Sequence, residues 1–276
     1  MKKRSLIAFI GLTIACSLFF SQKVSAHELY IEVDEFTDSE ELRVDIKWGH
    51  IRDYVDPADV EDYQLHVRYP NEDVEQLDLE ESGVYVRAYV PIEGDGDYVF
   101  WAERKPITYE PDDSVTQLSN QMAKHIHHVG DGNSTANEAV EAELEVIPTM
   151  NTANFSTGNF SGTIILDGDE VNDATVTAYG PEFEVLETVS ADDGTFDFTF
   201  DSAGKWLIRV NVEVDEPGSI EGEEYELISH TSTLLIDTEQ PAEDEAGDSN
   251  IWSLASMLVV GLLIGASVGM LILRRK

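Results

Sequence analysis

The sequence predicts an all-β protein: two tandem β-sandwiches of the immunoglobulin-like type, followed by a single C-terminal transmembrane helix. Three patterns support this prediction. Apolar and polar residues alternate with a period of two along many short segments, which is typical of half-buried strands. Turn sequences separate these segments at the spacing of a β-sandwich. The last apolar run has no charge from Ile251 to Leu273, which is long enough to cross roughly 30 Å of hydrocarbon.

The first sandwich is expected where apolar side chains recur at every second position after residue 27. Leu42, Val44 and Ile46, for example, alternate with charged residues. The expected strands lie at 29–33, 42–48, 65–69, 84–90 and 98–101. Gly94-Asp95-Gly96 marks a turn before the last of these, and the spacing of Val115, Leu118 and Met122 predicts one short helix.

The second sandwich is expected from Phe160 onwards. Asp192-Asp193-Gly194 and Ala203-Gly204 provide turn signals between its apolar segments. The expected strands lie at 161–166, 174–179, 185–189, 195–200, 205–214 and 229–236.

These patterns divide the chain into seven segments. They are a signal peptide (1–26), an N-terminal β-sandwich that is the candidate metal-binding domain (27–149), a linker (150–159), an Ig-like β-sandwich (160–237), an acidic stalk (238–250), a transmembrane helix (251–273) and a cytoplasmic tail (274–276).

The two ends of the chain predict its location. Met1-Lys2-Lys3-Arg4, an apolar run and the small-residue site Val24-Ser25-Ala26 form a secretory signal peptide. Arg274-Arg275-Lys276 follows the C-terminal apolar run, and positive charge beside a span stays in the cytoplasm. We therefore expect a single-pass protein of the cell membrane, with its ectodomain outside.

Cys16, the only cysteine, lies in the signal peptide, so the mature chain has no thiol chemistry.

The ectodomain is strongly acidic. Of the 17 Lys and Arg residues, seven lie in the signal peptide or the tail, which leaves 10 basic residues against 55 acidic ones, a net charge of −45. Such a surface repels nucleic acid, so no nucleic-acid partner is expected. Because the charges are scattered along every segment, adaptation to high salt or alkali explains most of them, and a cation-collecting role is the alternative.

The histidines are the candidate metal ligands: His27, His50, His125, His127 and His128. Cleavage after Ala26 would make His27 the mature N-terminus, and its amine and imidazole could then chelate one ion together. Imidazole suits nickel, copper, zinc and cobalt. Cleavage one residue earlier would give an Ala26-His27 start, whose amine, backbone amide and imidazole form a different chelate that also suits nickel or copper. The other alternative is that His27 merely follows the cleavage site.

His125 and His127 point to the same face if they lie on a strand, which would place two imidazoles within reach of one ion. The alternative for the His125–His128 run is a solvated polar loop. His50, within Trp48-Gly49-His50, is a ligand or a turn residue. His66 and His230 are expected to be exposed and structural, respectively.

These residues also resemble a known family. Ala26-His27-Glu28-Leu29-Tyr30, Trp48-Gly49-His50 and the later Ala203-Gly204-Lys205-Trp206 are similar to the nickel-uptake substrate-specific transmembrane-region family. The resemblance implies a surface or periplasmic β-sandwich protein that accompanies a nickel/cobalt transporter. By position, it assigns metal capture to His27 and His50, and it gives the 125–128 cluster no counterpart.

Three functions are consistent with the sequence. The first is a membrane-anchored protein that captures Ni²⁺ or Co²⁺, or less favourably Cu²⁺ or Zn²⁺, for an uptake transporter. The second is a structural surface protein or adhesin, and the third is a copper histidine-brace oxidase. We expect no enzyme, since G-x-S-x-G, H-E-x-x-H and phosphate-binding glycine loops are absent from the sequence.

The expected membrane helix also indicates a partner. Gly261, Gly265 and Gly269 form a stripe of small residues that would allow close packing against a transporter subunit or a second copy.

Overall fold

The computed structural model describes residues 27–111, 115–153 and 155–238, all of which belong to one compact unit, Met1–Thr238. The expected signal peptide, transmembrane helix with its glycine stripe, cytoplasmic tail and all but the first residue of the stalk lie outside these residues. Within the described ranges, no helix is long and apolar enough to span a membrane.

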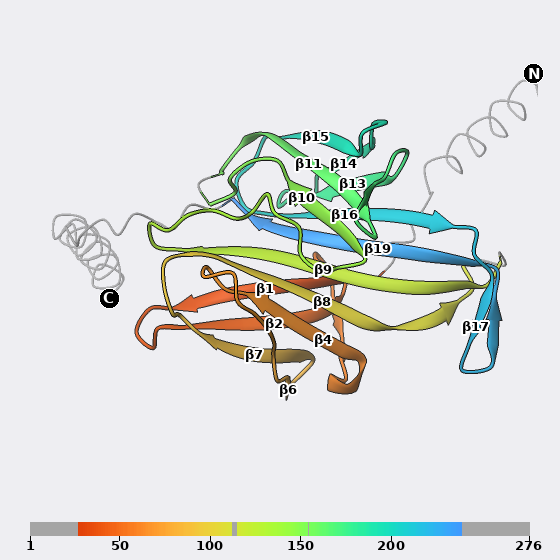
Figure 1. Cartoon of the computed structure of the whole chain (residues 1–276), viewed down its shortest axis with the longest axis horizontal. Coiled ribbons are helices and arrows are strands. Elements are labelled where there is room, and N and C mark those ends of the chain that lie inside the picture. Colours follow the sequence, from red (N-terminus) through yellow and green to blue (C-terminus); the bar gives the residue numbers. More distant parts are fainter. Residues whose placement is uncertain (1–26, 112–114, 154, 239–276) are drawn as a thin grey trace, which may run out of the picture. The chain divides into compact units, whose positions relative to one another are not determined.

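The all-β prediction is confirmed, and strands make up nearly all of the regular structure (Figure 1). The first ten strands are β1 Glu28–Phe36, β2 Glu41–Gly49, β3 Val55–Asp56, β4 Tyr63–Arg68, β5 Val74–Gln76, β6 Glu80–Ser82, β7 Tyr85–Pro91, β8 Gly96–Tyr109, β9 Gln117–Val129 and β10 Leu144–Pro148. The others are β11 Gly158–Leu166, β12 Asp169–Glu170, β13 Thr175–Tyr179, β14 Val185–Val189, β15 Thr195–Phe200, β16 Lys205–Val214, β17 Gly218–Ile220, β18 Glu223–Tyr225 and β19 Leu227–Asp237.

The helix expected around Val115–Met122 is wrong, because Gln117 to Met122 belong to the long strand β9. β9 lies between β8 and β19 and pairs with both. Backbone hydrogen bonds on two sides, together with side chains that alternate between two apolar cores, override the local helical spacing. In the described residues, the only helical element is the 3₁₀ turn Val60–Asp62, whose first turn is capped by the side chain of Asp59.

One eight-stranded sheet runs through both halves of the described chain, in the order β14-β13-β16-β19-β9-β8-β4-β5. Its neighbours are antiparallel except β19 and β9, which are parallel. A sheet of β1, β2, β7, β6 and β3 lies on one side of this shared sheet, and a sheet of β10, β11, β12 and β15 lies on the other (Figure 1).

Two hydrophobic cores therefore form on opposite faces of the shared sheet. The first core contains Leu29, Ile46 and Phe100, and the second contains Phe160, Phe200 and Trp206. β9 contributes to both cores because its side chains alternate between the two faces. Its residues in the first core are Ala123 and Val129, and those at the second are Met122 and Ile126.

The two expected sandwiches are thus present as two cores, but they are fused rather than arranged in tandem. β10 lies within the range expected for the first domain, 27–149, but it pairs with β11 and buries Leu144 and Val146 in the second core. A third, small cluster joins the halves, with Tyr30 of β1 packed against Leu207 and Leu235.

Candidate functional site

The site at the start of β1 is built by strand register. β1 pairs with β2 so that Glu28 lies opposite Gly49, which brings the preceding His27 and the following His50 to the same end of the sheet. Their ring centroids are 5.0 Å apart, and the rings are almost perpendicular at 88°. Two histidines that are distant in sequence therefore meet.

Gly49 allows the chain to turn back closely after β2. Its φ of +153° is accessible to glycine, and a Cβ at this position would lie 2.4 Å from the carbonyl oxygen of Tyr54. The backbone N–H of His50 donates to that carbonyl at 2.8 Å. The return path stacks Tyr54 on His50, with 4.9 Å between centroids, and brings Asp56 beside His27.

Asp56 fixes the orientation of the His27 ring. Its Oδ2 lies 2.6 Å from Nε2 of His27, so Nε2–H donates to the carboxylate and Nδ1 is left for another partner. Trp48 stacks on the His27 ring with 5.5 Å between centroids, and the guanidinium of Arg104 lies 4.6 Å from the indole centroid. The ring is therefore held by a carboxylate and an indole.

His50 has an unused ring nitrogen. Its Nε2 is buried and has no hydrogen-bond partner among the described residues. A buried polar atom without a partner costs free energy, and in native proteins it calls for an explanation such as a missing ion or water. The atom is a suitable type of ligand for a transition metal.

The residues at this end fit a metal only in part. In residues 27–111, 115–153 and 155–238, no group of three His, Cys, Asp or Glu side chains is arranged to hold an ion. The donors that remain are Nδ1 of His27, Nε2 of His50 and the α-amine that cleavage after Ala26 would create. Asp56 would act as the outer carboxylate that orients a ligating histidine.

Glu28, directly after His27, is buried. Burial raises the pKa of its carboxyl to about 7, while the positive charge of Arg209 opposes this shift. The start of β1 thus holds a carboxyl group that titrates near neutral pH.

The histidines of β9 do not form one site. His125 and His127 share a face, with ring centroids 6.4 Å apart, and Nδ1 of the buried His125 has no hydrogen-bond partner among the described residues. Burial lowers the pKa of His125 to about 3, and Nε2 of His127 lies 3.2 Å from a carboxylate oxygen of Glu35. His128 points to the opposite face of the sheet, where its Nδ1 lies 2.6 Å from Asp97.

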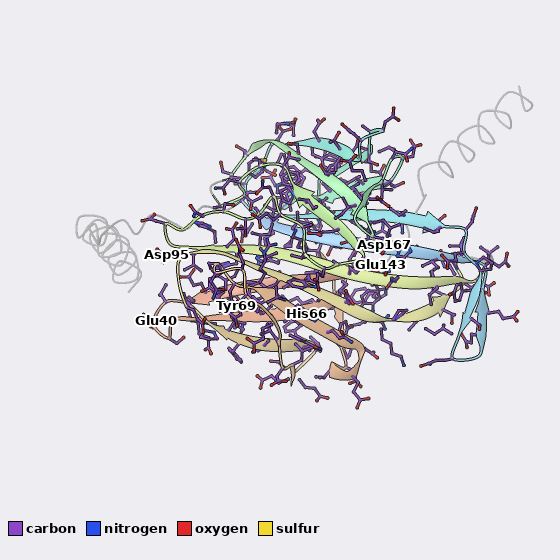
Figure 2. All side chains as sticks on the ribbon, viewed as in Figure 1. Glu40, His66, Tyr69, Asp95, Glu143 and Asp167 are labelled. Carbon is purple, nitrogen blue, oxygen red and sulfur yellow. The ribbon has the colours of Figure 1, made fainter. Side chains whose placement is uncertain are left out.

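The other two histidines also lie apart from the site. His66 of β4 is half-buried rather than exposed, and it stacks on Trp101 at 5.1 Å. His230 is buried, with its Nδ1 3.6 Å from Glu143. Figure 2 shows Glu143 beside Asp167, whose backbone N–H donates to the Glu143 carbonyl at 2.8 Å.

Sequence reasoning missed Asp56, Tyr54 and Arg104. Asp56 and Tyr54 follow Trp48-Gly49-His50 closely, and a turn predicted at Gly49 could have pointed to them. Arg104 lies on β8, and no local pattern connects it with Trp48. Only the packing of the β1–β2 layer over the shared sheet brings the two together.

The fold defines a β-sandwich protein with two fused cores. A family model described as "Domain of unknown function (DUF4198)" matches residues 24–214. The chain therefore belongs to this family, whose description states no activity. No curated protein matches the sequence.

Solved structures of other β-proteins show weak similarity. One is titled "Ca2+-stabilized adhesin helps an Antarctic bacterium reach out and bind ice", at 12% identity and a TM-score of 0.23, over 77% of this chain and 49% of that one. The fibronectin(III)-like modules of Clostridium thermocellum CbhA match at 10% identity and a TM-score of 0.19, over 82% and 98%. The chain spans about half the length of the adhesin chain. TM-scores this low carry no information about function.

Proposed function

We propose that this chain is a structural protein of the cell surface, in which two fused β-sandwiches form one stiff module. The observation that carries the proposal is the shared eight-stranded sheet, which supplies one wall to each core. If β9 were to leave the sheet, both cores would be exposed to water. A mechanical force that pulls on one half is therefore resisted by the other half. This property suits a protein that projects from a membrane.

The composition and the chain ends support the same proposal. A net charge of −45 on the expected ectodomain keeps such a module soluble and separates it from anionic surfaces. The predicted signal peptide and C-terminal span would place the module outside the cell, above an acidic stalk.

Unfolding followed from each core tests this function. Trp48 packs against the first core and Trp206 lies in the second, whereas Trp101 belongs to neither core. In the protein of residues 27–238, the double variant Trp101→Phe, Trp206→Phe leaves the Trp48 signal, and the double variant Trp48→Phe, Trp101→Phe leaves the Trp206 signal. We expect the two tryptophan signals to give the same urea midpoint, because the two cores unfold together. Digestion of the protein by protease added to intact cells tests its location. Two separate urea midpoints would contradict the proposal. So would resistance of the protein to protease that is added to intact cells.

A second candidate function is metal capture at the start of β1. The observation that favours it is the pairing of His27 with His50, in which Asp56 leaves Nδ1 of His27 available and Nε2 of His50 is buried without a partner. The amine and Nδ1 of an N-terminal His27 could close a chelate ring, and His50 would supply a third nitrogen. The metal would be Ni²⁺ or Co²⁺, or else Cu²⁺ or Zn²⁺, passed on to a membrane transporter.

Calorimetric titration in high salt tests this candidate. The protein that begins at His27 is compared with one carrying a single extra glycine before it, which removes the amine from the chelate. One-to-one binding of Ni²⁺ or Co²⁺ that the glycine weakens at least about tenfold supports capture, since a lost ligand costs at least as much as a lost outer-shell partner. Equal, salt-sensitive binding to both proteins would exclude it. Peroxide-dependent oxidation with Cu²⁺ would instead favour the histidine-brace oxidase.

A further inference from the structure

We infer that Arg52 is a positioning residue for the His27–His50 pair, because it ties the loop that carries His50 to the second core. The functional meaning of this inference rests on the metal-capture candidate, but its geometry stands on the contacts of Arg52 alone. It makes the candidate site a product of both cores, although its donor groups come from the first half of the chain.

Arg52 binds the backbone of the second half. Its Nη2 donates to the carbonyl oxygens of Gly180 and Glu184, the latter at 2.5 Å. These two residues close the turn between β13 and β14, in which Gly180 N–H donates to Glu184 O at 3.0 Å. Arg52 thereby holds both sides of one turn.

The turn is itself fixed to the second core. A Cβ at Gly180 would lie 2.5 Å from the ring of Trp206, so the backbone runs directly over this side chain. Trp206 is buried and stacks on Phe200 with 4.0 Å between ring centroids. The anchor that Arg52 uses is therefore rigid.

Aromatic and apolar contacts complete the tie. The guanidinium of Arg52 lies 5.7 Å from the ring centroid of Tyr179 and 5.5 Å from that of Phe183. On either side of Arg52, Ile51 and Val55 pack against the third cluster. The loop thus lies across the junction between the halves.

The same loop sets the position of His50. The N–H of Asp53 donates to the His50 carbonyl at 3.1 Å, and the His50 N–H donates to Tyr54. Arg52 lies at the tip of this closed turn, between His50 and the two residues that contact the rings, Tyr54 and Asp56. If the tip of this loop were not held, His50, Tyr54 and Asp56 could all move relative to His27.

The type of residue matters at this position. Seven of the ten basic residues of the expected ectodomain form ion pairs with carboxylates, whereas the contacts of Arg52 are of another kind. Arg52 contacts two carbonyl oxygens and two rings. A planar guanidinium suits this combination, whereas a lysine ammonium lacks the planar face that stacks on rings.

The test uses Arg52→Gln and Arg52→Lys in the full mature chain, with Arg43→Gln as the matched control. Arg43 lies on the same β2 strand that leads to His50, but its partners, Asp34 and Asp45, are within the first half. Two readouts are measured: the NMR cross-relaxation between the His27 and His50 ring protons, and the affinity for Ni²⁺ by titration. Thermal unfolding shows that each variant remains folded.

We expect Arg52→Gln to lose the His27–His50 cross-peaks and to weaken Ni²⁺ binding roughly 10–100-fold, as the loss of an orienting contact does. Arg52→Lys should restore the cross-peaks only in part, and Arg43→Gln should leave both readouts as in the wild type. Unchanged cross-peaks in Arg52→Gln would overturn the inference. If the wild type binds no Ni²⁺, metal capture fails, and the cross-peaks still decide whether Arg52 positions the pair.

Discussion

The histidines at the start of β1 and those at the end of β9 are arranged in opposite ways. His27 directly precedes β1 and His50 directly follows β2, and their ring centroids are 5.0 Å apart. His125, His127 and His128 are near neighbours in the sequence, yet the sheet separates them: His128 lies on the other face, with Asp97. Histidines that are distant in the sequence thus meet at the start of β1, whereas histidines that are close in the sequence are divided between two faces at the end of β9.

The strand geometry explains this difference. Successive side chains on a strand point to opposite faces, so a dense cluster on β9 is divided between two environments. The β1–β2 register, by contrast, brings His27 and His50 to one end of the sheet, and the turn after Gly49 adds Tyr54 and Asp56. Histidine density is therefore a poor guide to a site on a strand, and the register between strands is a better one.

The largest expected effect tests whether β9 is a structural region. The side chains of Lys124 and Glu145 form a fully buried ion pair next to His125. Lys124→Met leaves the Glu145 carboxyl buried without its partner, and we expect a loss of about 3–5 kcal/mol in the free energy of unfolding, measured with urea. Lys105→Met, at an exposed pair with Glu221, is the control and should cause no measurable change. A small loss at Lys124 would mean that β9 is not held by this pair.

The pH dependence of stability should have opposite signs in the two regions. His125 has its pKa lowered to about 3 by burial, so the unfolded chain binds the extra proton below about pH 6.5, and stability is lost as the pH falls. Burial raises the pKa of Glu28 to about 7, so the folded chain keeps this proton up to a higher pH than the unfolded chain does. Stability is therefore lost as the pH rises from about 4.5 through 7. Each slope is up to about 1.4 kcal/mol per pH unit.

Urea unfolding of Glu28→Gln and His125→Gln, measured from about pH 4 to about pH 8, separates these slopes. Relative to the wild type, Glu28→Gln should gain stability as the pH rises, and His125→Gln should gain stability as the pH falls. Parallel curves for a variant and the wild type would show that the replaced group does not titrate differently in the folded state.

Gly49→Ala tests the turn that positions His50, Tyr54 and Asp56 beside His27. The added Cβ would lie 2.4 Å from the Tyr54 carbonyl oxygen, at a φ that disfavours a side chain. We expect a loss of about 1–3 kcal/mol in the free energy of unfolding, together with a change in the His50 ring resonances. Gly83→Ala, at a positive φ but with open space around it, is the control for backbone strain alone. An equal loss in both variants would show that the close approach to Tyr54 is unimportant.

The smallest effect is expected at His127, which pairs with Glu35 near the surface. His127→Ala should change the free energy of unfolding by less than about 1 kcal/mol, as is usual for exposed ion pairs. It should also leave Ni²⁺ affinity unchanged, whereas His27→Ala should reduce it. A loss of affinity in His127→Ala would restore β9 as a candidate metal region.

Much of the fold could be predicted because its signals are local. The strand limits expected at 185–189, 195–200 and 205–214 coincide with β14, β15 and β16, since turns and a period of two mark them directly. The helix expected near Val115 failed because β19, one of the two strands that pair with β9, comes from a distant part of the chain. Of the candidate ligands, only His27 and His50 are brought together at the start of β1.

By itself, the sequence determined the all-β class, the positions of most strands and the strongly acidic character of the chain, because each depends on alternation, turn residues or composition. The tertiary structure alone decided that the two sandwiches share one sheet, that β9 serves two cores and that Arg52 reaches Gly180 and Glu184. These features depend on which strands become neighbours, and that choice is made by long-range pairing and packing rather than by local propensity.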